Sequence, residues 1–217
     1  MSAIEALRGE LLSSRTVVER IDYGMGEAAP LSPAAHHDGV PVRHTVGDFC
    51  RSSSLPPAWS RFLFHLVREL RPVRALELGT ALGVSAAYQG AALELNGRGR
   101  LVTVEGARPL AELAERNLGL LGIDRVEVVT GRFTDALPAV LDDLRPLDYA
   151  YIDGHHDGRA TRDYFEAVLG AIAGPALIVF DDIGISSGMR EAWAAIRRHP
   201  RVGTAIDLRK LGVCEVP

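Results

Sequence analysis

Cysteine is nearly absent from this chain of 217 residues, in which only Cys50 and Cys214 occur, far apart and without CxxC spacing. We therefore expect neither a disulfide framework nor a metal site built from thiolates. The chain also has no run of about 20 uninterrupted apolar residues, the length that a helix needs to cross a bilayer. It does not begin with a basic segment followed by an apolar run, as a signal peptide does. We therefore expect a soluble, cytoplasmic protein.

Lysine is scarcer still, because Lys210 is the only one and arginine supplies almost all of the positive charge. The formal net charge is −4 and the sequence pI is near 6.0, so the chain has no general attraction for nucleic acid or for an anionic membrane. We expect neither as a partner. With 47% hydrophobic and 24% charged residues, the composition is that of a globular protein. The length suits one sizeable α/β domain and is too short for two.

The N-terminal part of the chain has a different pattern from the rest. Residues 2–20 carry apolar side chains at helical spacing, which predicts an amphipathic helix. Residues 21–47 are rich in glycine and proline and have no clear period, and long segments of this kind are usually lids, binding loops or disordered. We therefore expect residues 1–56 to form a helix and a lid or substrate loop, in which Tyr23 and Met25 cover a bound substrate.

Strand and helix patterns alternate regularly after this segment. A helix is expected at 57–70, and further helices at 82–95, 107–121, 133–144, 159–172 and 187–198. Strands are expected at 73–78, 100–105, 125–130, 147–153, 176–182, 202–208 and 212–217, the last two joined by a short turn. Strands that alternate with helices of about 10–15 residues indicate a parallel sheet. We therefore predict that residues 57–217 form a Rossmann-like α/β domain, with a mostly parallel seven-stranded sheet, helices on both faces and a C-terminal antiparallel hairpin.

The ends of the first two predicted strands indicate a nucleoside ligand. Glu77, Gly79 and Gly83 form the pattern ExGxxxG, in which the glycines let the backbone approach a ligand closely. Because the pattern is not GxGxxG, it offers no dedicated pyrophosphate cradle, and a zwitterionic ligand without phosphate fits better. Glu105 ends the next strand, where a carboxylate can accept both hydroxyls of a ribose. The alternative is that Glu105 only caps the following helix.

Three carboxylates stand at the ends of two other predicted strands. Asp153 ends one strand, and Asp181 and Asp182 end the next. Because these strand ends should be neighbours, the acids would repel one another, and Mg²⁺ or Mn²⁺ is the natural counter-ion for such hard oxygen ligands. Solvated loop acids are the alternative. His156 lies three residues beyond Asp153 and can take a proton from a hydroxyl, a role for which His155 competes.

The string LELGTALGVSA, the later Glu105, and the segments YIDGHH and IVFDD together resemble the class I, metal-dependent O-methyltransferases, and the resemblance covers about residues 53 to 217. It implies S-adenosylmethionine as cofactor and divalent metal held by Asp153, Asp181 and Asp182. The cofactor contacts that it implies come from Glu77, Gly79, Thr80, Ser85, Glu105, Arg132, Phe133 and Asp153. At Arg132 and Phe133 the chain departs from the small or acidic residues that are usual beside the adenine.

Two further differences from the usual residues of the family indicate which of its members the chain resembles most. Asp182 stands where the catechol and caffeoyl-coenzyme A enzymes commonly have Asn, and His156 stands where catechol O-methyltransferase has a lysine. This combination looks more like the macrolide-sugar O-methyltransferases, in which the histidine is the proposed base and the metal chelates sugar hydroxyls. We therefore expect methyl transfer to a hydroxyl of a small molecule, a sugar or glycoside, with His156 and Asp153 as catalytic residues. A catechol or other phenol is the alternative acceptor, and relatives of this kind suggest a homodimer.

Three other functions remain open from the sequence. A nicotinamide-dependent oxidoreductase would have the same sheet and the same acid after the second strand, but it does not need so many carboxylates at strand ends. A binding or regulatory module could keep the fold without the chemistry. A methyltransferase without a metal would use Asp181 and Asp182 only to cap the end of a strand.

Overall fold

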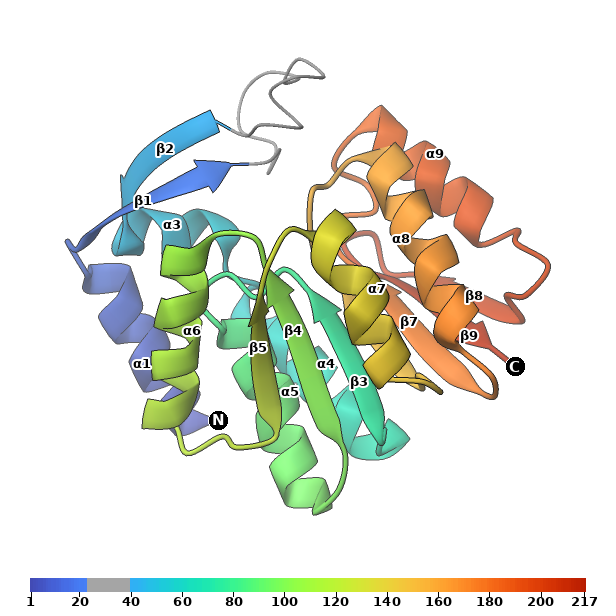
Figure 1. Cartoon of the computed structure of the whole chain (residues 1–217), viewed down its shortest axis with the longest axis horizontal. Helices are drawn as coiled ribbons and strands as arrows, with labels where there is room; N and C mark the ends of the chain where they lie inside the picture. The colour runs from blue at the N-terminus through green and yellow to red at the C-terminus, as the bar shows by residue number, and fades with distance from the viewer. Residues whose placement is uncertain (23–39) are drawn as a thin grey trace.

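A seven-stranded sheet forms the centre of the computed structural model, which describes residues 1–22 and 40–217 (Figure 1). Its strands are β3 (Arg74–Leu78), β4 (Arg100–Glu105), β5 (Val126–Thr130), β6 (Tyr149–Ile152), β7 (Ala176–Phe180), β8 (Thr204–Asp207) and β9 (Gly212–Val216). Their order across the sheet is β5-β4-β3-β6-β7-β9-β8. The first five strands run parallel, whereas β9 is antiparallel to both β7 and β8. The predicted fold class is therefore confirmed, including the C-terminal antiparallel hairpin.

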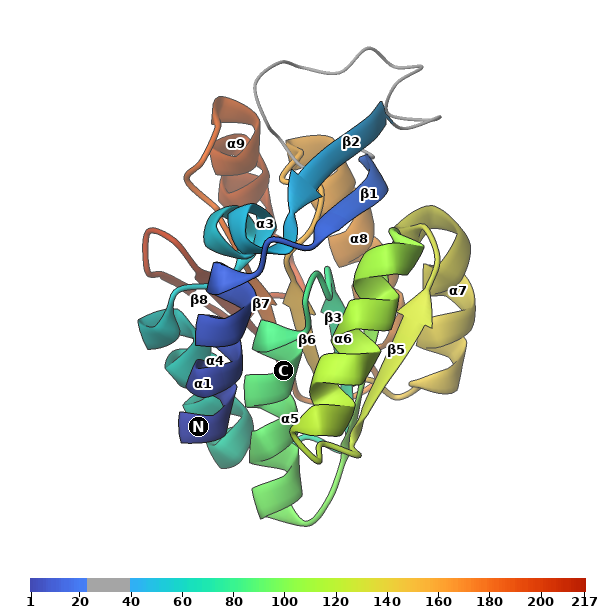
Figure 2. The same ribbon diagram turned by 90° about the vertical axis from the view of Figure 1, so that its left-hand side faces the viewer.

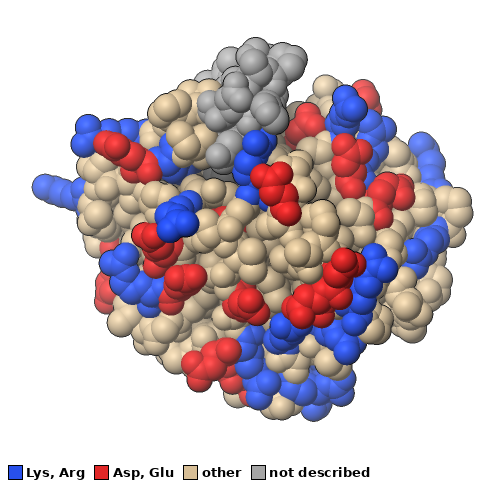
Figure 3. All heavy atoms as spheres, viewed as in Figure 1, with Lys and Arg blue, Asp and Glu red and all other residues tan. Residues whose placement is uncertain are grey.

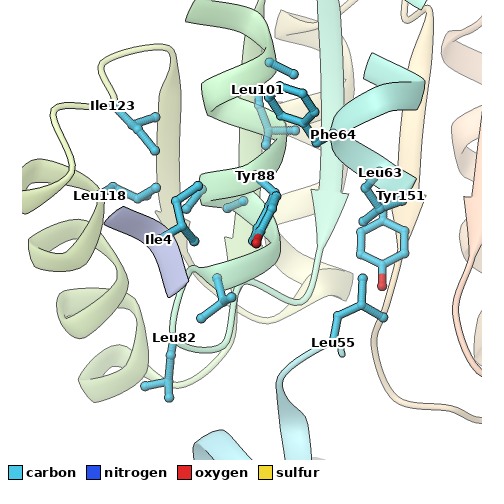
Figure 4. Packing of buried hydrophobic residues seen from close by; sticks show 14 of the residues in the cluster. Ile4, Leu55, Leu63, Phe64, Leu82, Tyr88, Leu101, Leu118, Ile123 and Tyr151 are labelled. Carbon is cyan, nitrogen blue, oxygen red and sulfur yellow. The ribbon is translucent and has the colours of Figure 1, made fainter. Parts of the chain in front are cut away.

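Helices cover both faces of this sheet because its strands are apolar on both sides. The helices are α4 (Pro57–Leu70), α5 (Val84–Asn96), α6 (Arg108–Leu120), α7 (Phe133–Asp143), α8 (Gly158–Ala171) and α9 (Ser187–Ile196). Within β3, Ala75 joins the apolar cluster beneath α4, α5 and α6, whereas its neighbour Leu76 joins the cluster beneath α7, α8 and α9. This alternation is what a strand buried on both faces requires. Figure 4 shows the first cluster around Tyr88 and Leu101.

The first helix is shorter than the sequence predicted. α1 (Ser2–Ser13) ends well before residue 20, and the chain then extends as β1 (Val17–Asp22). This strand pairs antiparallel with β2 (Val40–Thr45), so its backbone groups find partners in a hairpin that local spacing cannot reveal. The β-branched pair Val17 and Val18 also favours a strand.

The region predicted as one irregular segment, 21–47, is also more ordered at its end than expected. Besides β2, a helix α3 (Val46–Ser53) begins here, and the side chain of Thr45 accepts a hydrogen bond from the backbone N–H of Asp48 at its N-terminus. Tyr23 and Met25, expected to cover a bound substrate, lie outside the described residues.

The N-terminal elements pack onto the sheet domain. Apolar side chains of α1 and α3 belong to the same cluster as those of α4 and α5. The buried guanidinium of Arg8 donates hydrogen bonds to the carbonyl oxygen of Leu55 (2.9 Å) and to Oγ of Ser60 (3.1 Å), and Glu5 accepts a 2.7 Å hydrogen bond from the hydroxyl of Tyr88. Figures 1 and 2 place the β1–β2 hairpin beyond the carboxyl ends of the parallel strands. Among the described helices, none combines the length and apolarity needed to cross a bilayer.

Candidate active site

A cavity of about 450 Å³ lies at the carboxyl ends of the parallel strands. Gly79, Glu105 and Asp153, which follow or end β3, β4 and β6, form one side of it. The starts of α7 and α8 form another side, and the β1 residues Arg20 and Ile21 contribute from the N-terminal hairpin. Ligands of open α/β sheets bind at this edge, near the point where the strand order reverses. Here the reversal lies between β3 and β6, beside the cavity.

Only glycine fits at position 79. Its φ is +101°, and a Cβ at this position would lie 1.8 Å from the carbonyl oxygen of Asp153. The backbone of the turn after β3 therefore touches the end of β6, and the amide of Asp153 donates a 2.9 Å hydrogen bond to the carbonyl oxygen of Leu78. This close approach fixes the position of Asp153 relative to the cavity.

Glu105 is held by backbone amides at the cavity wall. Its Oε2 accepts a 2.8 Å hydrogen bond from the N–H of Ala81, and its Oε1 accepts a 2.9 Å bond from the N–H of Ala107. Burial raises the pKa of Glu105, while these backbone donors and the charge of Arg20 oppose the increase. Since a carboxylate oxygen can accept two hydrogen bonds, Glu105 keeps the capacity to accept ribose hydroxyls.

Three predicted cofactor residues lie behind the glycine turn rather than on the cavity wall. The carboxylate of Glu77 is fully buried and accepts hydrogen bonds from Gln89 Nε2 (2.9 Å) and Thr103 Oγ1 (2.7 Å). Thr80 and Thr103 share a 2.7 Å hydrogen bond between their hydroxyls, and Ser85 also bonds to Glu77. Burial raises the pKa of Glu77 to about 7, against the lowering effect of these hydrogen bonds. The network holds the turn that carries Gly79.

Arg132 and Phe133, for which contacts with the adenine are predicted, line the cavity. The ring of Phe133 packs edge-on against His155 and Tyr164, whose own rings are stacked with centroids 5.8 Å apart. A Cβ at Gly154 would lie 2.4 Å from the ring of Phe133, so the aromatic wall requires glycine there.

Sequence reasoning missed Tyr164 as a cavity residue. A signal was present, because Asp157, Ala160 and Tyr164 recur at the spacing of one helical face, beginning just after the DGHH segment. It also missed Arg20, whose Nε donates a 3.2 Å hydrogen bond to Nε2 of His44 and whose guanidinium lies 5.1 Å from the ring centroid of Phe49. No local signal marks Arg20, because its position depends on the hairpin.

The structure brings the three predicted acids to neighbouring strand ends and places two of them beside one histidine. Because Ile152 of β6 pairs with Phe180 of β7, Asp153 and Asp181 follow on neighbouring strands. His156 Nε2 lies 3.7 Å from Oδ1 of Asp153, and His156 Nδ1 lies 4.0 Å from Oδ2 of Asp182. The predicted base therefore stands between two of the carboxylates.

The backbone of this region is unusual. His155, His156 and Asp182 all adopt the left-handed conformation, with φ of 60°, 43° and 49°. Non-glycine residues seldom do so, and such residues cluster at sites where surrounding contacts enforce the geometry. Three of the six non-glycine residues with positive φ in the described part of the chain thus lie in the two loops that carry the histidines and the acids.

The acids are costly to ionise together. Burial raises the pKa of Asp153 to about 7, the charges of Glu77 and Asp182 add to the increase, and a 2.9 Å hydrogen bond from the hydroxyl of Tyr151 opposes it. Burial also raises the pKa of Asp181 to about 8, with further increases from the charges of Asp153 and Asp182. A nearby cation stabilises the ionised form of such a group.

Lys210, which sequence reasoning missed, supplies a cation. Its Nζ lies 2.6 Å from Oδ1 of Asp182 and 3.1 Å from Oδ1 of Asp181. The donor chemistry of the three acids suits Mg²⁺ or Mn²⁺, but the lysine ammonium occupies two of them. In the part of the chain that the structure describes, no group of three or more His, Cys, Asp or Glu side chains is arranged to hold a metal ion.

Charged side chains of both signs are spread over the face of the molecule that Figure 3 shows. The cavity has the same mixed character, since Arg132 and Arg159 line it together with Asp157 and Asp163. Its walls therefore combine hydrogen-bonding groups of both kinds with the aromatic rings.

Comparisons with known proteins agree with this site. A family model described as a methyltransferase domain matches residues 76–183, which include the turn after β3 and all three acids. An O-methyltransferase from Bacillus cereus, solved with S-adenosylhomocysteine, has a TM-score of 0.65 and 27% identity, over 76% of this chain and 83% of that one. No curated protein matches the chain.

Two further solved structures are similar. The O-methyltransferase TomG from Streptomyces achromogenes, involved in tomaymycin synthesis and solved with S-adenosylmethionine, has a TM-score of 0.65 and 25% identity, over 76% of this chain and 81% of that one. The methyltransferase PaMTH1 from Podospora anserina, at 16% identity, shares the fold, with a TM-score of 0.61 over 88% of this chain and 99% of that one. The chain therefore belongs to the class I, S-adenosylmethionine-dependent O-methyltransferases.

Proposed function

We propose that this enzyme transfers the methyl group of S-adenosylmethionine to a hydroxyl of a sugar or glycoside. The observation that carries the proposal is that Asp153 belongs both to the cavity, whose wall includes Glu105, and to the cluster of Asp153, His156, Asp181 and Asp182 at the ends of β6 and β7. A nucleoside can be held at the first place while a hydroxyl is activated at the second.

The cavity residues fit the parts of the cofactor. Glu105 accepts the ribose hydroxyls, and the turn at Gly79 lets the backbone approach the methionine portion. Arg132 and Phe133 border the adenine. Asp153 favours a cationic ligand at this point, and S-adenosylmethionine carries both an ammonium and a sulfonium. Glu77, Thr80 and Ser85 act indirectly, by holding the turn in place.

His156 acts as the base. Its neutral imidazole takes the proton of the acceptor hydroxyl, the oxygen attacks the methyl carbon in line, and S-adenosylhomocysteine leaves as a neutral thioether. The carboxylates of Asp153 and Asp182, at 3.7 and 4.0 Å, stabilise the imidazolium that results. Much of the rate enhancement comes from holding oxygen and methyl carbon in contact, which removes entropy from the barrier.

The polar side chains of α8 support a hydroxyl-rich acceptor. Asp157, Arg159 and Asp163 line the cavity and can bind several hydroxyls at once. The stacked rings of His155 and Tyr164 in the cavity support the alternative, a catechol or other phenol, because aromatic rings pack favourably on one another.

This mechanism uses no metal ion, because Lys210 forms ion pairs with two of the three acids. Transfer assisted by Mg²⁺ or Mn²⁺ is the second candidate. One observation favours it: Oδ1 of Asp181 is buried and accepts no hydrogen bond within the described part of the chain, because the ammonium of Lys210, 3.1 Å away, donates its hydrogen bond to Oδ2 at 3.2 Å instead. In that candidate Asp153, Asp181 and Asp182 hold the ion, and Lys210 moves away from them.

An acceptor screen tests the proposal. Purified enzyme is incubated with S-adenosylmethionine and a panel of sugars, glycosides and catechols, and both S-adenosylhomocysteine and the methylated product are measured by mass spectrometry. We expect product from at least one sugar or glycoside. Product from catechols alone would overturn the sugar assignment, and repeating the screen with EDTA separates the two candidates.

A homodimer formed through N-terminal elements, and a cytoplasmic location, remain predictions. Light scattering of the protein as it leaves a size-exclusion column tests the predicted homodimer, since a dimer has twice the 23.4 kDa mass of the chain.

A further inference from the structure

Lys210 is fixed next to the acidic cluster by its own backbone. It lies in the turn between β8 and β9, where its N–H donates a 2.9 Å hydrogen bond to the carbonyl oxygen of Leu208. Its carbonyl oxygen accepts a 3.2 Å hydrogen bond from the N–H of Ile183, the residue directly after Asp182. The turn is anchored further by Trp193, whose Nε1 donates a 3.0 Å hydrogen bond to Asp207. Lys210 therefore moves with the loop that carries the acids.

The side chain of Lys210 forms ion pairs with both acids of that loop. Its Nζ contacts Asp182 Oδ1 at 2.6 Å and Asp181 Oδ1 at 3.1 Å, and its side chain is only 26% exposed. Asp181 itself is almost fully buried, at 6% exposure. A buried carboxylate next to a half-buried one needs a counter-charge, and removing the charge partner from such a site leaves an uncompensated charge.

The choice of lysine rather than arginine at position 210 also fits this role. Lys210 is the only lysine in a chain that otherwise uses arginine. A lysine ammonium is a compact point charge, whereas an arginine guanidinium is planar and larger. The space between two carboxylates that follow one another in sequence accommodates this compact cation.

We propose that the ammonium of Lys210 is the resident cation of this active site and takes the place of the divalent metal ion that the metal-dependent enzymes use. Lys210 is a positioning residue: it holds Asp182 so that this carboxylate lies beside His156. The inference rests on the proposed function, because it assigns a role in methyl transfer to the cluster.

Two consequences follow for metal ions. The wild-type enzyme should not bind Mn²⁺ at the cluster, because the ammonium already contacts the oxygens of Asp181 and Asp182 that would hold the ion. Removing the ammonium should leave Asp181 and Asp182 free to turn towards Asp153, and the hard oxygens of three carboxylates suit Mn²⁺ and Mg²⁺. The variant Lys210→Met, which keeps most of the side-chain length without the charge, should therefore gain a metal site that the wild type lacks.

The experiment measures Mn²⁺ binding to the full chain by calorimetry and by electron paramagnetic resonance, without any acceptor. We expect no binding of Mn²⁺ to the wild type at millimolar concentration. We expect Lys210→Met to bind one ion at an Mn²⁺ concentration at least tenfold lower than the highest one at which the wild type still binds none. The double variant Lys210→Met with Asp181→Asn should lose that site again. Arg209→Met is the matched control, since it removes a positive charge from the same turn at an exposed position, and it should behave as the wild type.

Activity provides a second readout. Wild-type turnover should be the same with EDTA and with Mg²⁺, whereas Lys210→Met should lose at least tenfold in kcat with EDTA and regain part of it with Mg²⁺. The KM for S-adenosylmethionine should change little, because Glu105 and the glycine turn remain intact.

The outcomes separate the inference from the proposed function. One Mn²⁺ bound to the wild type at the cluster, or loss of wild-type activity with EDTA, would overturn the role of Lys210. Failure of every sugar in the acceptor screen, with the metal-binding pattern as expected, would overturn the acceptor and leave the cation assignment standing. If Lys210→Met does not fold, as shown by its thermal melt and its affinity for S-adenosylhomocysteine, the wild-type metal titration and Lys210→Gln decide the question.

Discussion

Replacing Glu77 with Gln tests the buried network beneath the cavity. Burial raises the pKa of Glu77 from its ordinary value of 4.5 to about 7, so the folded chain keeps a proton that the unfolded chain has already released. The unfolding free energy therefore falls as the pH rises from about 4.5 to about 7. At about 1.4 kcal/mol for each pH unit of this window, ionisation of Glu77 lowers the unfolding free energy by about 3 kcal/mol.

The variant Glu77→Gln keeps the size of the side chain and cannot ionise. Urea unfolding of both proteins between about pH 5 and pH 8 should show that the variant gains about 3 kcal/mol relative to the wild type as the pH rises. Asp153 and Asp181 have pKa values raised mainly by burial in both proteins, so most of their contribution cancels in the comparison. The part of the Asp153 shift that comes from the charge of Glu77 is lost in the variant and acts in the same direction as the expected gain. Glu112→Gln, at an exposed position of α6, is the control, and its curve should stay parallel to that of the wild type. Parallel curves for Glu77→Gln as well would refute this account of the network.

Three further substitutions test the site directly. His156→Ala should lower kcat by about 10²- to 10⁴-fold and leave the affinity for S-adenosylhomocysteine nearly unchanged, as calorimetry can check; a loss of cofactor binding would contradict the assignment as base. Glu105→Gln should weaken binding of S-adenosylhomocysteine by about 10- to 100-fold, because hydrogen bonds to a charged group are replaced by neutral ones; unchanged affinity would remove Glu105 from the ribose site. Gly79→Ala should lower the unfolding free energy by roughly 3 kcal/mol or more, since its Cβ would lie 1.8 Å from the carbonyl oxygen of Asp153, and a thermal melt like that of the wild type would contradict the geometry of the turn.

The sheet could be predicted from the sequence because its signals are local. Each parallel strand is a short apolar run followed by a helix with its own period, so the alternation alone indicates a βαβ fold. The convergence of Asp153 with Asp181 and Asp182 followed from the same rule, since the carboxyl ends of parallel strands lie at one edge.

Features that depend on contacts distant in sequence could not be predicted. The strand at 17–22 exists because it pairs with 40–45, across a segment that carries no periodic signal. Lys210 reaches the acids only because β9 returns antiparallel to β7, which places the β8–β9 turn beside Asp182. Its one sequence signal, that it is the only lysine, has meaning only once its neighbours are known.

A crystal structure of the enzyme with S-adenosylhomocysteine is the most direct test of the central claim, that a nucleoside site in the cavity adjoins the acid–histidine cluster through Asp153. The account predicts ribose hydroxyls within hydrogen-bonding distance of Glu105 and the sulfur atom directed towards Asp153 and His156. Cofactor bound with its ribose away from Glu105, or with its sulfur directed away from His156, would contradict it.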